Sequence, residues 1–230
     1  MKNLIILHGA LGAKSQFEQV AALLKDHFHV SVLEFEGHGT RSADEVSFSM
    51  ELFAHSLKKF LQQQQIEQPL VFGYSMGGYV ALKLESQEPG SFEQIITLGT
   101  KFDWNPESAE KEAGMLHAEK IEAKVPAFAA YLKSLHGADH WKTVLERTAT
   151  MMLDLGNRPA LSPDDYHRIQ IPVRLLRGSK DTMVTEEETK EVLHLLENGN
   201  YLEIAGWQHP VNLISPKELA QQVLSLYLPG

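Results

Sequence analysis

The sequence predicts an α/β fold: a doubly wound, mainly parallel sheet of about six strands with an inserted helical cap. Three observations favour this class. Short and almost continuously apolar runs recur along the chain, as they do in strands that are covered on both faces. Amphipathic helical patterns alternate with those runs, which is typical of parallel strands joined by crossover helices. One interval of roughly 70 residues, between positions 99 and 171, is far longer than a crossover.

Each expected strand combines β-branched or aromatic residues with few charges. In chain order the strands are residues 3–7, 29–35, 69–74, 94–99, 171–178 and 201–205. Residues 49–61 repeat apolar side chains every three or four positions, as an amphipathic helix does. Two later helices begin at Thr185 and Ser215, each followed three positions later by a glutamate that completes a capping box. The first of these two helices is expected to end at Gly199.

The long interval predicts a helical cap inserted into the sheet domain. Its helical signals are the Asn105-Pro106 start, residues 127–135, residues 141–155 and the Ser162-Pro163 start. We therefore expect a core formed by residues 1–100 and 169–230 and a cap formed by residues 101–168. A wholly separate domain is the alternative, but strands of one sheet flank the segment.

The composition excludes several classes of protein. The chain has 230 residues, a net charge of −9 and no cysteine. An acidic surface repels phosphate backbones, so we expect no nucleic-acid partner, and cysteine metal sites are excluded. The N-terminal apolar run from Leu4 to Leu7 is too short for a signal peptide, and no run approaches the roughly 20 residues of a membrane span. We expect a cytoplasmic protein with no membrane partner, and the sequence predicts no oligomeric state.

One serine stands out between a predicted strand and a predicted helix. Ser75 has Gly73 two positions before it and Gly77 two positions after it, which matches G-x-S-x-G. A sharp strand-to-helix turn needs small neighbours at these positions and exposes the central hydroxyl. Ser75 is therefore a candidate nucleophile. The alternative is a glycine-rich junction with an incidental serine.

A serine nucleophile needs a base and an acid that orients the base. Asp181 directly follows the predicted strand 171–178, and His209 follows the strand 201–205. Both therefore fall at strand ends, in the chain order that the G-x-S-x-G turn predicts. Asp103, just after the fourth strand, is an alternative acid.

Two backbone amides are expected to form an oxyanion hole. One belongs to Met76, which directly follows the serine, and the other belongs to Ala10, in the glycine-containing loop after the first strand. Leu11 is an alternative donor, and its side chain is expected to line the substrate pocket. Trp104 and Met183 are further pocket candidates because they lie near motif ends, although such residues are also common in cores.

Several motifs together carry a resemblance that covers essentially the whole chain: "LHGALG", "FEGHGTRS", "GYSMGG", "RGSKDTMV" and "WQHP". The chain resembles the α/β-hydrolase fold, in the group of small esterases and carbon–carbon bond hydrolases with a helical cap. Three features depart from the family pattern. The usual first two strands are expected to be absent from the core, and Glu34-Phe35-Glu36 precedes Gly37 where the family usually has an aspartate. Gln208 precedes His209 where the family often has glycine.

The resemblance implies a serine mechanism with no metal or organic cofactor and a small substrate that contains a carbonyl group. The expected reaction is hydrolysis of a small carboxylic ester or thioester through an acyl-enzyme. The alternatives are a carbon–carbon bond hydrolase or lyase, a cofactor-free perhydrolase and a non-catalytic ligand receptor. His8 is expected to brace the oxyanion loop, and His136 and His140 are interpreted as a solvated helix end rather than metal ligands.

Overall fold

The structure is a computed structural model that describes residues 1–227 of the chain. Its centre is one sheet of six strands in the order β2-β1-β3-β4-β5-β6, and every neighbouring pair is parallel. The strands are β1 (Lys2–Leu7), β2 (Phe28–Leu33), β3 (Leu70–Tyr74), β4 (Gln94–Leu98), β5 (Val173–Gly178) and β6 (Gly199–Ile204). The predicted six-stranded parallel sheet is confirmed.

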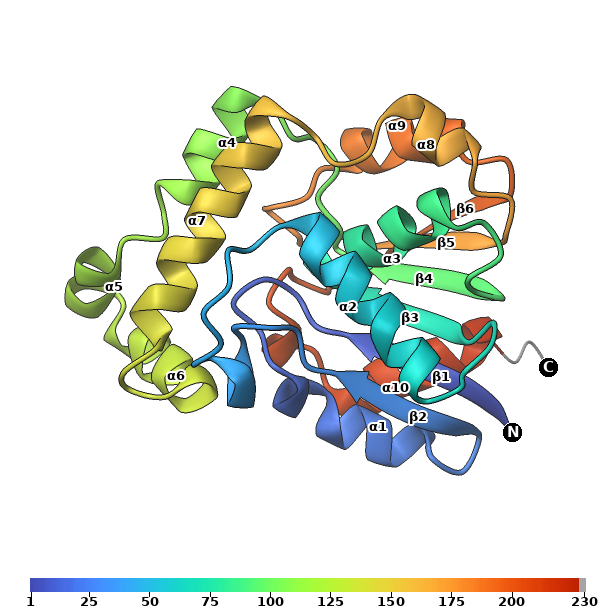
Figure 1. The fold of residues 1–230 in the computed structure, drawn as a ribbon, viewed down its shortest axis with the longest axis horizontal. Coiled ribbons are helices and arrows are strands. Elements are labelled where there is room, and N and C mark those ends of the chain that lie inside the picture. Colours follow the sequence, from blue (N-terminus) through green and yellow to red (C-terminus); the bar gives the residue numbers. More distant parts are fainter. Residues whose placement is uncertain (228–230) are drawn as a thin grey trace.

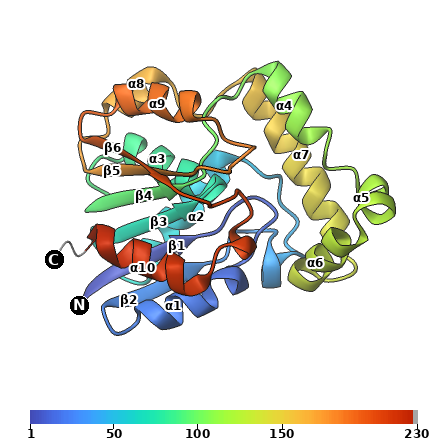
Figure 2. The same ribbon diagram turned by 180° about the vertical axis from the view of Figure 1, so that it is seen from behind.

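Helices cover both faces of this sheet (Figures 1 and 2). On one face α1 (Glu18–Leu24) and α10 (Pro216–Tyr227) pack over Leu4 and Ile6 of β1. On the other face α2 (Met50–Gln63), α3 (Met76–Gln87) and α9 (Glu186–Leu195) pack over Ile5 and Leu7. Residues 4–7 of β1 are thus fully buried on alternating faces, which explains why the inner strands are almost continuously apolar, whereas the edge strands β2 and β6 are partly exposed.

Four helices between β4 and β5 lie together beside the sheet (Figure 1). They are α4 (Pro106–Ala113), α5 (Ala118–Lys124), α6 (Pro126–His136) and α7 (Trp141–Asn157), called the helical insertion below. The insertion has a small core of its own, centred on the fully buried Trp141. The next helix, α8 (Pro163–His167), packs instead against α3 and α9. The division of the chain at residues 101 and 168 remains a prediction.

The caps and turns position the ends of these elements. Asn105, Ser162 and Thr185 each accept a hydrogen bond from the third residue of the helix that follows, as capping residues do. The helix after Thr185 ends at Leu195 rather than near Gly199. The reason is that Leu196 is extended and buried, which redirects the chain into β6 before the glycine is reached.

Candidate active site

Ser75 lies in the turn between β3 and α3, at the carboxyl edge of the sheet. Its φ of 50° and ψ of −119° fall in a region that residues with a side chain rarely occupy. Two contacts hold this conformation. The Ser75 amide donates to the carbonyl of Leu98 at 2.8 Å, and the Thr100 hydroxyl donates to the Ser75 carbonyl at 2.9 Å. The neighbouring strand β4 and the segment just after it thus fix the strained turn.

The two glycines that flank Ser75 occupy places with no room for a side chain. A Cβ at Gly73 would lie 2.5 Å from the backbone of Gly78, and a Cβ at Gly77 would lie 2.5 Å from the carbonyl oxygen of Leu7. Both obstacles are backbone atoms, which cannot rotate away. The turn therefore requires glycine at both positions of the motif.

Asp181 and His209 meet at the ends of β5 and β6. Nδ1 of His209 lies 2.8 Å from Oδ2 of Asp181. The other carboxylate oxygen of Asp181 accepts the amides of Met183 and Val184 at 2.8 and 3.0 Å. The two backbone amides fix the position of the Asp181 carboxylate, and the fixed carboxylate in turn orients the imidazole of His209.

The environment favours the charged form of Asp181. Its burial alone would raise the pKa of the carboxyl group, but the hydrogen bond and charge of His209 and the two backbone amides together lower the pKa below its ordinary value. A carboxylate held in this way keeps a proton on Nδ1 of the imidazole and leaves Nε2 free to accept another.

Two residues that brace this pair were not identified from the sequence. The guanidinium of Arg177 donates to the carbonyls of Val184 and Asp181 at 2.7 and 2.9 Å, so it ties both ends of the loop of residues 181–184 to β5. The Tyr74 hydroxyl donates to the carbonyl of His209 at 2.8 Å. The local sequence around Arg177 and Tyr74 does not indicate these roles, because their hydrogen-bond partners lie on loops that only the folded chain brings close to them.

The loop after β1 approaches the serine closely. A Cβ at Gly9 would lie 3.1 Å from Cβ of Ser75, so a side chain there would crowd Ser75. His8 braces this loop, since Nδ1 donates to the carbonyl of Gly9 at 2.8 Å and Nε2 accepts the amide of Phe35 at 3.2 Å. Within residues 1–227 the Ala10 amide has no hydrogen-bond acceptor. Leu11, the next residue, has a φ of 57°.

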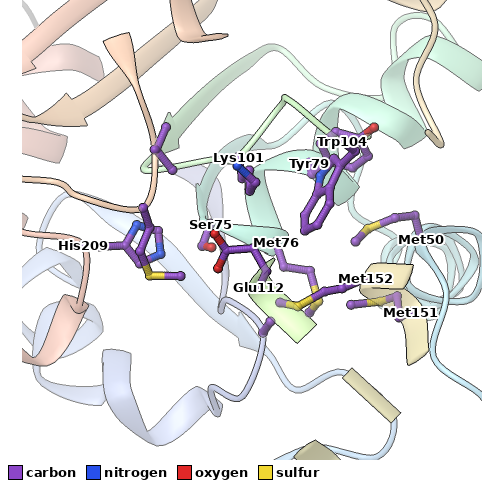
Figure 3. Close-up of a pocket in the computed structure, with 13 residues that line it drawn as sticks. Met50, Ser75, Met76, Tyr79, Lys101, Trp104, Glu112, Met151, Met152 and His209 are labelled. Carbon is purple, nitrogen blue, oxygen red and sulfur yellow. The ribbon is translucent and has the colours of Figure 1, made fainter. Parts of the chain in front are cut away.

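Two adjoining chambers open at Ser75. The larger, about 350 Å³, is lined by residues of the loop after β1, of the helical insertion and of the segment after β6. The smaller, about 40 Å³, extends toward α2 and α7. Both are lined by Ala10, Ser75, Glu112, Met152, Met183 and His209. Figure 3 shows the smaller chamber with Ser75 and His209 on one side and methionines on the other.

The other predicted site residues are divided between these chambers. Leu11 lines the larger chamber, whereas Met76 and Trp104 line the smaller one, and Met183 lines both. Asp103, the alternative acid, is exposed and accepts a hydrogen bond from the Asn105 side chain. The structure therefore brings Asp181, and not Asp103, to His209.

Sequence reasoning missed one acidic residue of the cavity. Glu112, on α4, lines both chambers and is 5% exposed. Nothing in its local sequence distinguishes it from Glu107 or Glu110, which are exposed on the same helix. Only the rotation of α4 against α7 decides which glutamate faces the cavity.

The interpretation of His136 as part of a solvated helix end is wrong. Its ring is buried, and Nε2 donates to the carbonyl of Leu11 at 3.0 Å while Nδ1 accepts the amide of Gly39 at 3.0 Å. The reason is that the end of α6 packs onto the loops that follow β1 and β2. His136 thus connects the helical insertion to the loop that contains Ala10.

Two kinds of feature are absent from residues 1–227. No helix in this range is long and apolar enough to cross a membrane. No group of three or more histidine, aspartate or glutamate side chains in the same range is arranged to hold a metal ion.

The sequence is similar to one family of known proteins. A family model for the alpha/beta hydrolase fold matches residues 2–149. The chain is 25% identical to sn-1-specific diacylglycerol lipase ABHD11 of Xenopus laevis, over 91% of this chain and 74% of that protein. It is 21% identical to (E)-2-((N-methylformamido)methylene)succinate hydrolase of Acinetobacter baylyi, over 95% of this chain and 87% of that protein.

Solved structures share the fold. The enol-lactonase from Burkholderia xenovorans has a TM-score of 0.78 at 16% identity, with 98% of this chain and 91% of that chain covered. A thermophilic esterase from Thermogutta terrifontis has a TM-score of 0.77 at 19% identity, with 99% and 89% covered. The resemblance predicted from the motifs is therefore confirmed: the chain belongs to the alpha/beta hydrolase fold family, and it is an enzyme, a hydrolase.

Proposed function

We propose that this hydrolase cleaves small carboxylic esters or thioesters through an acyl-enzyme on Ser75, with His209 as the base and Asp181 as the residue that orients it. One observation carries the proposal. His209 is held by the 2.8 Å contact with Asp181 and lines the same two chambers as Ser75. A hydroxyl in a strained turn, an oriented imidazole and a buried carboxylate are the parts that this chemistry requires.

The first half of the reaction acylates the serine. Oγ of Ser75 attacks the carbonyl carbon while Nε2 of His209 takes the hydroxyl proton, and Asp181 stabilises the imidazolium that forms. The oxyanion of the tetrahedral intermediate accepts hydrogen bonds from the amides of Ala10 and Met76. Met76 is the first residue of α3, so its amide has no partner within the helix. The intermediate collapses when the imidazolium gives its proton to the departing alcohol or thiol.

The second half repeats these steps with water. His209 takes a proton from a water molecule that attacks the acyl carbonyl, and the same two amides stabilise the second oxyanion. The imidazolium then returns a proton to Oγ of Ser75 as the carboxylic acid leaves. The substrate, one water molecule and these residues supply all the atoms and protons that the two half-reactions require.

Most of the lining of the chambers is apolar, which suits the hydrocarbon parts of a small ester. The side chains that line both chambers are mostly methionine, aliphatic or aromatic, and no arginine is among them. The names of two similar proteins, a diacylglycerol lipase and an esterase, are consistent with ester cleavage. The larger chamber, about 350 Å³, has room for a short acyl or alcohol group.

The proposal is tested with p-nitrophenyl acetate and butyrate. Wild type is expected to hydrolyse both and to be labelled once by a fluorophosphonate, whereas Ser75→Ala loses the labelling and nearly all of the rate. Ser134→Ala, which changes an exposed serine of the insertion, serves as the control and keeps both. Equal rates in wild type and Ser75→Ala would reject the proposed nucleophile. Faster cleavage of β-diketones than of esters would favour carbon–carbon bond hydrolysis instead.

A further inference from the structure

Glu112 places a buried carboxylate in the cavity that contains Ser75 and His209 (Figure 3). The residue is 5% exposed and lies in the last turn of α4. Glu112 and Ser75 each line both chambers, so both residues lie at the junction of the two chambers. None of the steps proposed above uses this carboxylate.

The protein does little to stabilise this charge. Within residues 1–227 the Glu112 carboxylate forms no hydrogen bond and no ion pair. Lys101, the one lysine of the smaller chamber, lies 3.7 Å from Glu188 and over the ring of Trp104 instead. The last turn of a helix is also the negative end of its dipole, which disfavours a carboxylate. Glu112 is therefore largely buried without a protein partner, while its carboxylate oxygens remain accessible.

An isolated buried carboxylate destabilises a protein unless something else satisfies it. At the junction Ala10, Met152 and Met183 contribute apolar side chains, and His209 is held by Asp181. The Ala10 amide and the Ser75 hydroxyl also lie there, but the proposed reaction assigns both to the substrate. The open side of the carboxylate faces the cavity. A ligand that fills this cavity excludes water from the carboxylate, so the ligand is expected to supply the hydrogen-bond donor in its place.

We propose that Glu112 is a specificity-determining residue that selects esters with a hydrogen-bond donor, a hydroxyl or an ammonium group, close to the scissile bond. The inference rests on the proposed ester hydrolysis at Ser75 and adds the class of substrate. A carboxylate accepts hydrogen bonds and offers none, so a donor on the substrate satisfies it. A substrate carboxylate at the same place meets a like charge in a cavity of low polarity and is rejected.

The test compares five esters of similar size. Ethyl butyrate is the reference; ethyl 3-hydroxybutyrate and 2-hydroxyethyl butyrate carry a hydroxyl on the acyl or alcohol side, ethyl 3-aminobutyrate carries an ammonium group, and monoethyl succinate carries a carboxylate. In wild type at least one donor ester is expected to exceed ethyl butyrate in kcat/KM by about tenfold or more, and monoethyl succinate to fall below it by a similar factor. The hydroxyl and ammonium arms distinguish a neutral from a cationic substrate.

Glu112→Gln keeps the size of the side chain and removes its charge. The ratio of kcat/KM for the best donor ester to that for monoethyl succinate is expected to fall by about tenfold or more in this variant. Glu110→Gln removes an exposed charge from the same helix and is expected to keep the wild-type ratio.

Two outcomes separate this inference from the proposed function. If wild type is labelled at Ser75 and hydrolyses ethyl butyrate but treats all five esters alike, the role of Glu112 is rejected and the esterase mechanism is retained. This comparison needs only wild type, so it holds even if Glu112→Gln fails to fold. If wild type is neither labelled nor active on any of the esters, the proposed function itself is rejected. An unchanged ratio in a folded Glu112→Gln also overturns the inference.

Discussion

Nδ1 of His209 lies 2.8 Å from Oδ2 of Asp181, and this contact joins the loops that follow β5 and β6. We expect Asp181→Asn to lower kcat/KM for p-nitrophenyl butyrate by about 10⁴-fold, because an amide in this place favours the wrong tautomer of the imidazole. Steady-state kinetics at pH 7.5 measure the loss, and circular dichroism establishes that the variant is folded.

Asp103→Asn is the matched control for this change. Asp103 follows β4 and is exposed, and its side chain contacts Asn105. We expect its kcat/KM to stay within about twofold of wild type, since exposed substitutions of this kind rarely disturb a site. A large loss in Asp103→Asn with none in Asp181→Asn would exchange the roles of the two carboxylates.

Arg177 is expected to position the loop of residues 181–184, which contains Asp181. Its guanidinium donates to the carbonyls of Asp181 and Val184 and to the side chain of Glu203. Arg177→Met keeps the aliphatic part and removes all three bonds, so we expect kcat/KM to fall by up to about 100-fold as Asp181 shifts. The free energy of unfolding should fall by about 1–3 kcal/mol, because two backbone carbonyls lose their donor.

The control for this prediction is Arg174→Met on the same strand. Arg174 is half-buried and its guanidinium has no hydrogen-bond partner within residues 1–227. Urea unfolding and ester kinetics are expected to change little in this variant. Equal losses in the two variants would mean that Arg177 acts through general stability and not through the loop.

The sequence predicted the parts of this molecule whose determinants are local. The inner strands are visible because they are buried on both faces and carry almost no polar residues there, as in residues 4–7 of β1 and in β3. Ser75 is visible because two glycines must flank it, and each of those glycines faces backbone atoms. Asp181 and His209 were located by their places after strands, and the roles of these residues remain predictions.

Residues whose partners come from distant elements were not predicted. His136 contacts the carbonyl of Leu11 across 125 positions of the chain, and no pattern near His136 indicates that loop. Glu112 differs from its neighbours only in the direction in which it faces. The helices of the insertion lack the continuous apolar runs that mark the inner strands. The packing of α4 and α6 therefore decides which of their polar residues are buried.

The hydrogen bonds of His136 connect the helical insertion to the loop after β1, so we expect a change at His136 to affect both stability and activity. His136→Phe keeps the volume but leaves the Gly39 amide and the Leu11 carbonyl without partners. We expect the free energy of unfolding to fall by about 2 kcal/mol or more, and kcat/KM for p-nitrophenyl butyrate to fall because Leu11 adjoins Ala10. Chemical denaturation and ester kinetics measure the two effects.

His140 provides the comparison for His136. It precedes α7, it is half-exposed, and its side chain makes no capping hydrogen bond. We expect His140→Phe to change the free energy of unfolding by no more than about 0.5 kcal/mol. If His136→Phe is equally silent in both measurements, the contacts with Leu11 and Gly39 contribute nothing to the site.

His8 predicts how stability depends on pH. Both ring nitrogens are used by the neutral form, in which Nδ1 donates to Gly9 and Nε2 accepts from Phe35, so a second proton would face the Phe35 amide. Burial, with smaller opposing effects from the Gly9 bond and the Glu34 charge, lowers the pKa of His8 from 6.5 to about 4. Between these two values the unfolded chain binds a proton that the native protein does not bind.

The free energy of unfolding is therefore expected to fall as pH drops from 6.5 toward 4, with no further change from His8 below its native pKa of about 4. From pH 7.5 to pH 5 the His8 contribution amounts to about 2 kcal/mol, and the buried His38 and His136, whose pKa values are also lowered, add to it with the same sign. Urea unfolding at both pH values measures the difference. His8→Gln should show a difference that is smaller by about 2 kcal/mol, whereas the exposed His29→Gln should keep it. A difference that His8→Gln leaves unchanged would mean that His8 titrates alike in the folded and unfolded chain.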